Sequence, residues 1–143
     1  MESIQVRAKV EGWQKTVRKY QTPNVRKAVI QILNSFLPYL FFWVLAYLSL
    51  DISIWFSLSF SILAGAFLTR IFIIQHDCGH QSFFKEKKWN NRVGFVASIV
   101  SSIPYKLWAK MHNVHHNHNG QYEYRGLGDI GFFTTDEFSW IFL

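Results

Sequence analysis

The chain has 143 residues, half of them hydrophobic and 18% aromatic, and a formal net charge of +6. This length fits one domain at most. The positive charge would suit a nucleic-acid partner, but seven of the fifteen Lys and Arg residues precede residue 28 and the next is Arg70. Membrane topology and attraction to anionic lipid head groups explain such a distribution, so we expect no nucleic-acid partner.

Residues 1–27 form a polar, basic segment that we expect to lie in the cytoplasm, as an amphipathic helix on the membrane surface. The following interval, residues 28–69, contains no Lys or Arg and one acid, Asp51. Its length corresponds to two membrane crossings of about 20 residues each. We predict spans at residues 29–50 and 54–74, with a polar turn between them.

Basic residues flank both outer ends of this hairpin, whereas the turn has none, so the positive-inside rule places both ends in the cytoplasm. The predicted fold is all-α: an integral membrane hairpin of two transmembrane helices with cytoplasmic helices after it. The alternative is a buried helical hairpin in a soluble protein.

The second span continues without a helix breaker into the first of two histidine stretches, HDCGH at residues 76–80. We predict one long helix that leaves the membrane and carries His76 and His80 on one face, because residues at i and i+4 are neighbours. Cys78, at i+2, is predicted to point away as a packing residue. Asp77 is either an acceptor for a ligating imidazole N–H or an exposed helix residue.

Residues 85–92 are expected to form a charged connection, and residues 93–105 are apolar but too short to span a bilayer. That apolar segment is predicted to be re-entrant, interfacial or packed beneath the cytoplasmic part, with Pro104 as its end. A further helix then carries HNVHH at residues 112–116. Near the end of the chain, Thr134 and Glu137 have the spacing of a capping box that opens another helix.

The two histidine stretches together predict a metal site. Five of the six histidines lie in them, and His118, the sixth, falls outside the i, i+3, i+4 set. His115 and His116 diverge by about 100° around a helix, so one ion could hardly take both, whereas two adjacent ions could take one each. The predicted ligands are His76, His80, His112, His115 and His116. Imidazole suits zinc, copper, iron and nickel alike, so the spacing does not choose the metal.

Over residues 28–128 the sequence resembles the membrane fatty acid desaturase family. The resemblance is most specific in HDCGHQSFF at residues 76–84 and HNVHH at 112–116, and residues 125–129 resemble the segment after the second box in bacterial members. It implies a multi-pass protein of the bacterial inner membrane. It also implies two irons held by histidine boxes that include His76, His80, His112, His115 and His116.

The family carries a third box, HxxHH or QxxHH, after a second membrane hairpin. We therefore expect residues 28–143 to be a desaturase domain that is incomplete at its carboxyl end, and the 143-residue chain to be inactive alone. The resemblance gives no role to His118.

The activity implied is oxygen-dependent introduction of a cis double bond into a lipid acyl chain, with electrons from a ferredoxin-like or cytochrome b5-like donor. Basic residues after the second span either dock an acidic donor or only follow the topology rule: Lys85, Lys87 and Lys88. Three alternatives remain open. One is a related membrane di-iron hydroxylase or ketolase, and another is a non-catalytic membrane metal-binding protein. The third is a non-catalytic truncated relative that acts as a partner subunit.

Overall fold

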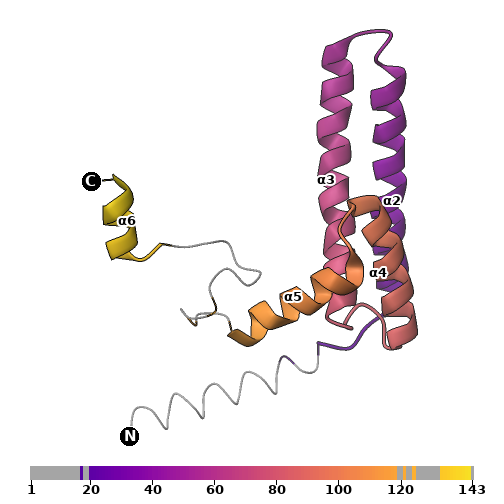
Figure 1. Cartoon of the computed structure of the whole chain (residues 1–143). Coiled ribbons are helices and arrows are strands. Elements are labelled where there is room, and N and C mark those ends of the chain that lie inside the picture. The colour runs from indigo at the N-terminus through magenta and orange to yellow at the C-terminus, as the bar shows by residue number, and fades with distance from the viewer. Residues whose placement is uncertain (1–16, 18–19, 119–120, 122–123, 125–132, 143) are drawn as a thin grey trace, which may run out of the picture.

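The computed structural model describes residues 17, 20–118, 121, 124 and 133–142. Within these residues the fold is all-α, as predicted, and its elements are α2 (Val25–Leu48), α3 (Ile54–Gly79), α4 (Lys87–Ser101), α5 (Tyr105–His118) and α6 (Thr135–Phe142) (Figure 1). Most of the predicted surface helix, at residues 1–16 and 18–19, lies outside the described part, as do residues 125–129.

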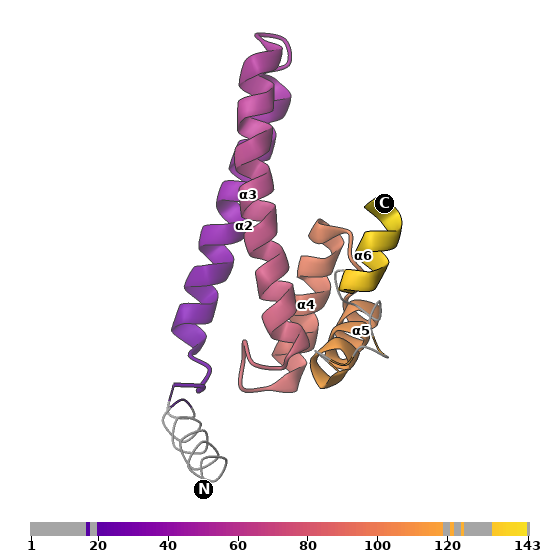
Figure 2. The same ribbon diagram turned by 90° about the vertical axis from the view of Figure 1, so that its left-hand side faces the viewer.

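Helices α2 and α3 form an antiparallel hairpin, side by side in both views (Figures 1 and 2). Asn24 and Ser53 cap their amino termini through side-chain oxygens that accept backbone N–H groups. Small residues line the contact, and the Ser57 hydroxyl donates to the Ala46 carbonyl at 2.8 Å. The predicted spans are confirmed, although the first helix begins at Val25 rather than residue 29 because Asn24 supplies its cap.

The exposure of the apolar side chains of α2 and α3 distinguishes a membrane hairpin from the buried helical hairpin of a soluble protein. Both helices are long and apolar enough to cross a bilayer, yet only 11% and 22% of their most apolar stretches are buried. A core helix of a soluble protein would be mostly buried. The outward side chains of α2 and α3 are therefore suited to lipid, which favours the membrane interpretation over the soluble hairpin.

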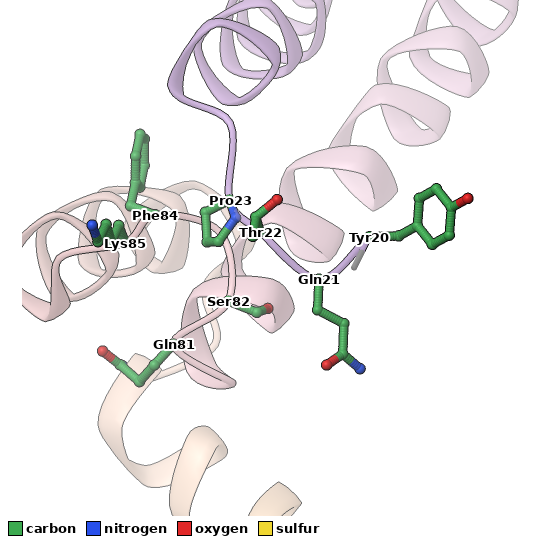
Figure 3. A pocket seen from close by; sticks show the side chains of 8 residues that line it. All are labelled: Tyr20, Gln21, Thr22, Pro23, Gln81, Ser82, Phe84 and Lys85. Carbon is green, nitrogen blue, oxygen red and sulfur yellow. The ribbon is translucent and has the colours of Figure 1, made fainter. Parts of the chain in front are cut away.

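The prediction of a charged connection at residues 85–92 is wrong, because α4 already begins at Lys87. The reason is a buried side chain, Asn90. Its amide oxygen accepts the Phe84 N–H at 2.9 Å, and its amide nitrogen donates to the carbonyls of Phe84 and Glu86 at 2.7 and 3.2 Å. These bonds fix the preceding loop onto the first turn of α4. The loop itself lies near residues 20–23, which precede α2 (Figure 3).

Helix α4 runs back along α3 (Figure 1). Residues 93–101 pack on α3 through Gly94 and Ala97, which are buried, while Phe95 and Ile99 on other faces are 59% and 64% exposed. The re-entrant, interfacial and packed settings for residues 93–105 all stay predictions.

Helix α4 ends at Ser101, where Ser102 adopts a left-handed conformation with φ 57°, before the predicted breaker Pro104 is reached. Pro104 instead lies at the start of α5, where its carbonyl accepts the Trp108 N–H at 2.9 Å. At the far end, Thr134 caps α6 through reciprocal bonds with Glu137, which confirms the capping box.

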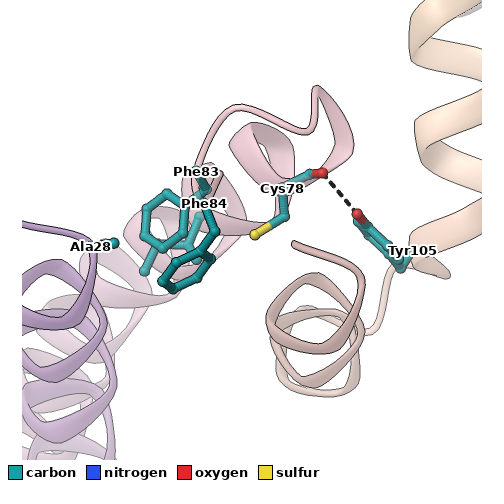
Figure 4. Packing of buried hydrophobic residues seen from close by; sticks show 6 residues of the cluster. Ala28, Cys78, Phe83, Phe84 and Tyr105 are labelled. Carbon is teal, nitrogen blue, oxygen red and sulfur yellow. Dashed lines mark hydrogen bonds between the residues drawn. The ribbon is translucent and has the colours of Figure 1, made fainter. Parts of the chain in front are cut away.

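The core lies at the open end of the hairpin, where α2, α3 and the loop before α4 meet (Figure 4). Its buried members are Ala28, Ile74, Cys78, Phe83, Phe84 and Tyr105. Cys78 is fully buried, so its predicted packing role is confirmed. The Tyr105 hydroxyl donates to the Cys78 carbonyl at 2.8 Å (Figure 4). This bond attaches the first turn of α5 to the last turn of α3, and so positions the two helices that carry the histidines.

Candidate metal centre

Two helices bring four histidines together. Helix α3 carries His76 and His80 one turn apart near its carboxyl end, and α5 carries His112 and His116 one turn apart in its second half. The two predicted pairs therefore face each other across the α3–α5 contact. His76, His80 and His112 are half-buried, and His116 is exposed.

The Nε2 atoms of these four side chains converge. His112 Nε2 lies 3.0 Å from that of His76, 3.2 Å from that of His80 and 3.0 Å from that of His116, and the His76–His80 distance is 3.3 Å. All four candidate ligand atoms lie within 4.8 Å of one another. His112 is thus the central member of the cluster.

This spacing fits coordination to a single ion. Imidazole nitrogens bound at about 2.0–2.1 Å to one ion lie about 2.9–3.4 Å apart when they are neighbouring ligands. Four pairs in the cluster are in this range, at 3.0–3.3 Å, and all four atoms lie within 4.8 Å of one another. The donor set is neutral and contains only nitrogen, which suits iron, zinc, copper and nickel better than magnesium or calcium. The residues present therefore fit a transition metal.

The other two histidines lie apart from these four nitrogens. The His115 ring is beside the cluster, with centroids 5.8 Å from His112 and 5.4 Å from His116, on the diverging side that the sequence predicted. His118 ends α5, with its Nδ1 2.9 Å from the Val114 carbonyl oxygen and its ring 4.0 Å from that of Tyr124. Neither belongs to the four-nitrogen group.

Neighbouring side chains orient the cluster. His76 Nδ1 lies 3.0 Å from Asp77 Oδ1, so a proton on Nδ1 leaves the Nε2 lone pair directed at the other histidines. The sequence predicts that Asp77 is either an acceptor for an imidazole N–H or an exposed helix residue, and its distance from His76 Nδ1 fits the acceptor. The Trp108 ring stacks on His112 at 4.5 Å with an interplanar angle of 17° and meets the edge of Phe72 at 5.3 Å. Sequence reasoning gave Trp108 no role.

The electrostatics of the site favour the neutral form of two histidines of the cluster, His112 and His80. Burial, followed by the charges of the surrounding histidines, lowers the pKa of His112 to about 4. The same two causes lower the pKa of His80. Neutral imidazole is the form that binds metal, so both side chains are ready to coordinate without first losing a proton.

Gln75, which sequence reasoning missed, connects the two histidine helices. It is fully buried; its Nε2 donates to the Ile103 carbonyl at 3.1 Å, and its Oε1 accepts the Ser101 hydroxyl at 2.6 Å. Ser101 ends α4, and Ile103 is two residues before α5. Gln75 therefore fixes the start of α5 relative to His76, the residue that follows Gln75 on α3. A lone Gln beside a histidine carries no sequence signal of this role.

We expect Gln75→Leu to lower the metal affinity about tenfold, because α5 loses its alignment with α3 while all the histidines remain. The measurement is a metal titration with the absorption spectrum of bound Co²⁺ as readout, since a change in ligand geometry alters that spectrum. Thr69→Val is the control, because Thr69 is exposed and bonds only within α3, to the Gly65 carbonyl. Wild-type affinity and spectrum in Gln75→Leu would contradict the positioning role.

Comparisons with known proteins identify the family that the chain resembles. The family model described as "Fatty acid desaturase" matches residues 52–142. The chain is 44% identical over 124 residues to a fatty acid desaturase of Bacillus subtilis, covering 87% of this chain and 35% of the relative. It is 39% identical over 99 residues to an sn-1 oleoyl-lipid 12-desaturase of Anabaena variabilis, covering 68% of this chain and 27% of the relative.

Another relative is the sn-1 acyl-lipid omega-3 desaturase (ferredoxin) of a Nostoc species, 33% identical over 99 residues, with 68% of this chain and 27% of the relative covered. The chain spans about a third or less of the length of these curated relatives. No solved structure matches.

Proposed function

The chain belongs to the fatty acid desaturase family, and we propose that it supplies the first membrane hairpin and two histidine boxes of an enzyme that desaturates lipid acyl chains. The proposed reaction is oxygen-dependent and leaves a cis double bond. The observation that carries the proposal is the convergence of four imidazole Nε2 atoms from α3 and α5 at the end of a membrane-spanning helix.

The location of the cluster suits a substrate that is drawn from the bilayer. Along the α3 axis, His76 lies about 9 Å and His80 about 15 Å beyond Arg70, at 1.5 Å per residue. The Arg70 side chain bonds to Asn34 and Ser35 on α2, which marks a polar level in the hairpin. With this level at the membrane boundary, the metal centre lies just outside the hydrocarbon, within reach of an acyl tail.

In this proposal the cluster holds iron through His76, His80, His112 and His116, and His115 is a ligand of a second, adjacent iron. Bound iron supplies the redox chemistry with dioxygen that removes two hydrogens from unactivated methylene groups, for which side-chain acid–base chemistry is too weak. Residues 28–143 then belong to one desaturase domain, and residues 1–27 are a basic cytoplasmic segment before it.

The protein's own side chains have three tasks around this centre. Asp77 holds the proton on His76 Nδ1, so that Nε2 remains a ligand. Trp108 and Phe72 cover one side of the histidines with apolar surface, which keeps water from that side. The low pKa of His112 keeps its ring neutral through the physiological range.

Turnover would require electrons from a ferredoxin-like or cytochrome b5-like donor, and the Nostoc relative's name includes ferredoxin. In this proposal both histidine boxes lie on the cytoplasmic side of a bacterial inner membrane, where such donors occur. Exposed lysines before and within the first turn of α4 are candidates for docking an acidic donor: Lys85, Lys87 and Lys88.

The test is product analysis by mass spectrometry after expression of the full-length protein in a host with a simple fatty acid composition. The proposal predicts acyl chains that have lost two hydrogens, only when oxygen is present and the histidines are intact. Acyl chains that gain one oxygen would instead identify a hydroxylase. Bound zinc with unchanged lipids would identify a non-catalytic metal-binding protein.

A further inference from the structure

A groove of about 450 Å³ lies between the first turns of α2 and α4, and we call it the apolar groove. Val25 and Val29 of α2 form one wall, and Trp89 and Val93 of α4 form the other. Its remaining lining residues are Phe84, Lys85 and Glu86. The volume is within the range of pockets that bind small organic molecules, and the walls suit a hydrocarbon chain.

A second hollow, of about 580 Å³, adjoins the first, and we call it the polar hollow (Figure 3). It lies between residues 20–23 and the loop that follows α3, and its lining includes Gln21, Thr22, Gln81 and Ser82. Phe84 and Lys85 line both hollows. The pair therefore has the shape of an amphipathic ligand, with an apolar compartment and a polar compartment that meet at a cationic side chain.

The surroundings are strongly basic. Around Lys85, the first turn of α2 carries Arg26 and Lys27 and the first turn of α4 carries Lys87 and Lys88, all exposed. Two acids are nearby: Glu86, and Asp77, which lines an adjacent hollow with Lys27 and Ser82. The basic residues outnumber them. This charge favours an anionic ligand.

Trp89 adds a second sign of a lipid interface. Its ring is 46% exposed, and the Arg92 guanidinium lies 5.3 Å from the ring centroid. Tryptophan is enriched at the level of lipid head groups, and Arg there reaches phosphate while its stem covers apolar surface. With the level of Arg70, Asn34 and Ser35 at the membrane boundary, Val29 lies about 8 Å and Val25 about 14 Å outside the hydrocarbon. The apolar groove therefore opens on the head-group side of that boundary.

The groove is separate from the metal centre. Ile74 and Cys78 belong to the core that Phe84 completes, and each lies two residues, about 200° of helix rotation, from His76. They therefore occupy the face of α3 opposite the histidines. A chain in the apolar groove would be held behind this core and could not reach the four nitrogens.

We propose that the apolar groove and the polar hollow together bind one anionic glycerophospholipid from the leaflet at the open end of the hairpin. An acyl tail lies between α2 and α4, the phosphate pairs with Lys85, and the rest of the head group occupies the polar hollow. This lipid is bound as a fixed structural ligand and is not the substrate. The proposal requires the membrane hairpin and does not depend on the proposed catalytic activity.

The experiment uses the full-length protein in phosphatidylcholine nanodiscs that contain a minor fraction of brominated lipid, which quenches tryptophan on contact. The fluorescence of Trp89 is obtained as the difference between the tryptophan fluorescence of the wild type and that of the Trp89→Phe variant. We expect brominated phosphatidylglycerol to quench it about fivefold more effectively than brominated phosphatidylcholine at the same fraction, the preference that one basic residue provides.

Two variants test the contributions of Lys85 and of the apolar groove independently. Lys85→Glu should abolish the preference for phosphatidylglycerol. Val29→Phe, which adds no tryptophan, should fill the apolar groove and block access of a brominated tail to Trp89. Lys106→Glu is the control for Lys85→Glu, because Lys106 is an exposed lysine on α5 that lines neither hollow. Equal quenching by the two lipids, equal loss in both lysine variants, or a Trp89 signal that neither lipid quenches because another part of the protein fills the groove would overturn the proposal.

Discussion

Replacing His112 with alanine is expected to abolish desaturation and to lower the affinity for iron by more than about 100-fold, the upper end of the loss that outer-shell partners produce. His112 is the central nitrogen of the cluster, within 3.0–3.2 Å of those of His76, His80 and His116. Its loss also removes the surface on which Trp108 stacks. The measurement is iron content per chain by elemental analysis, together with product formation.

The control for His112→Ala is His118→Ala on the same helix. Because His118 contacts Val114 and Tyr124 and lies outside the four-nitrogen group, its variant should keep wild-type iron and activity. A loss of iron from His118→Ala as complete as from His112→Ala would contradict the ligand assignment. His115→Ala has its own expected result, a fall from two irons to one, because we assign His115 to the second iron alone.

Gly94→Ala is expected to destabilise the protein by about 1–3 kcal/mol, the usual cost of overpacking, and to weaken metal binding without any change in the histidines. A Cβ atom at residue 94 would lie 2.4, 2.6 and 2.9 Å from three atoms of the Tyr105 ring. The ring cannot simply turn away, because its hydroxyl donates to the Cys78 carbonyl and contacts Gln81. The first turn of α5 must move, and His112 moves with it.

The measurements for Gly94→Ala are thermal unfolding in detergent and iron affinity. Gly65→Ala is the matched control, because a Cβ atom there would meet nothing within 4 Å and alanine favours the helix. If both glycine variants unfolded at the wild-type temperature and bound iron equally well, the close packing of α4 on Tyr105 would have no part in positioning α5.

The parts of the fold that the sequence predicted are those encoded by local patterns. The interval before Arg70, which has no Lys or Arg and a single acid at the turn, predicts the hairpin because charge in a bilayer is costly. Thr134 with Glu137 predicts a helix start because the capping bonds are local. The beginning of α4 was mispredicted for the opposite reason. It depends on Asn90, whose side chain reaches back six residues to Phe84, and nothing in the charged segment itself indicates that contact.

The candidate site shows the same division. The i, i+4 spacings of His76 with His80 and of His112 with His116 predict two pairs, each on one helix face. The clustering of five histidines in two stretches predicts that the pairs share one site. How the pairs meet was not predictable, because it depends on Gln75 and Tyr105, which join α5 to α3 through hydrogen bonds over long sequence separations. The sequence positions could not tell His116, which is inside the four-nitrogen group, from its neighbour His115. Which of the two faces α3 depends on the rotation of α5 about its own axis, and tertiary packing sets that rotation.

The central claim is that histidines from α3 and α5 hold iron, and Fe K-edge X-ray absorption on the purified full-length protein tests it most directly. Our account predicts a first shell dominated by nitrogen at about 2.0–2.2 Å, outer scattering typical of imidazole, and loss of the iron signal in His112→Ala. Iron retained unchanged in His112→Ala, a sulfur-dominated shell, or zinc in place of iron would contradict it.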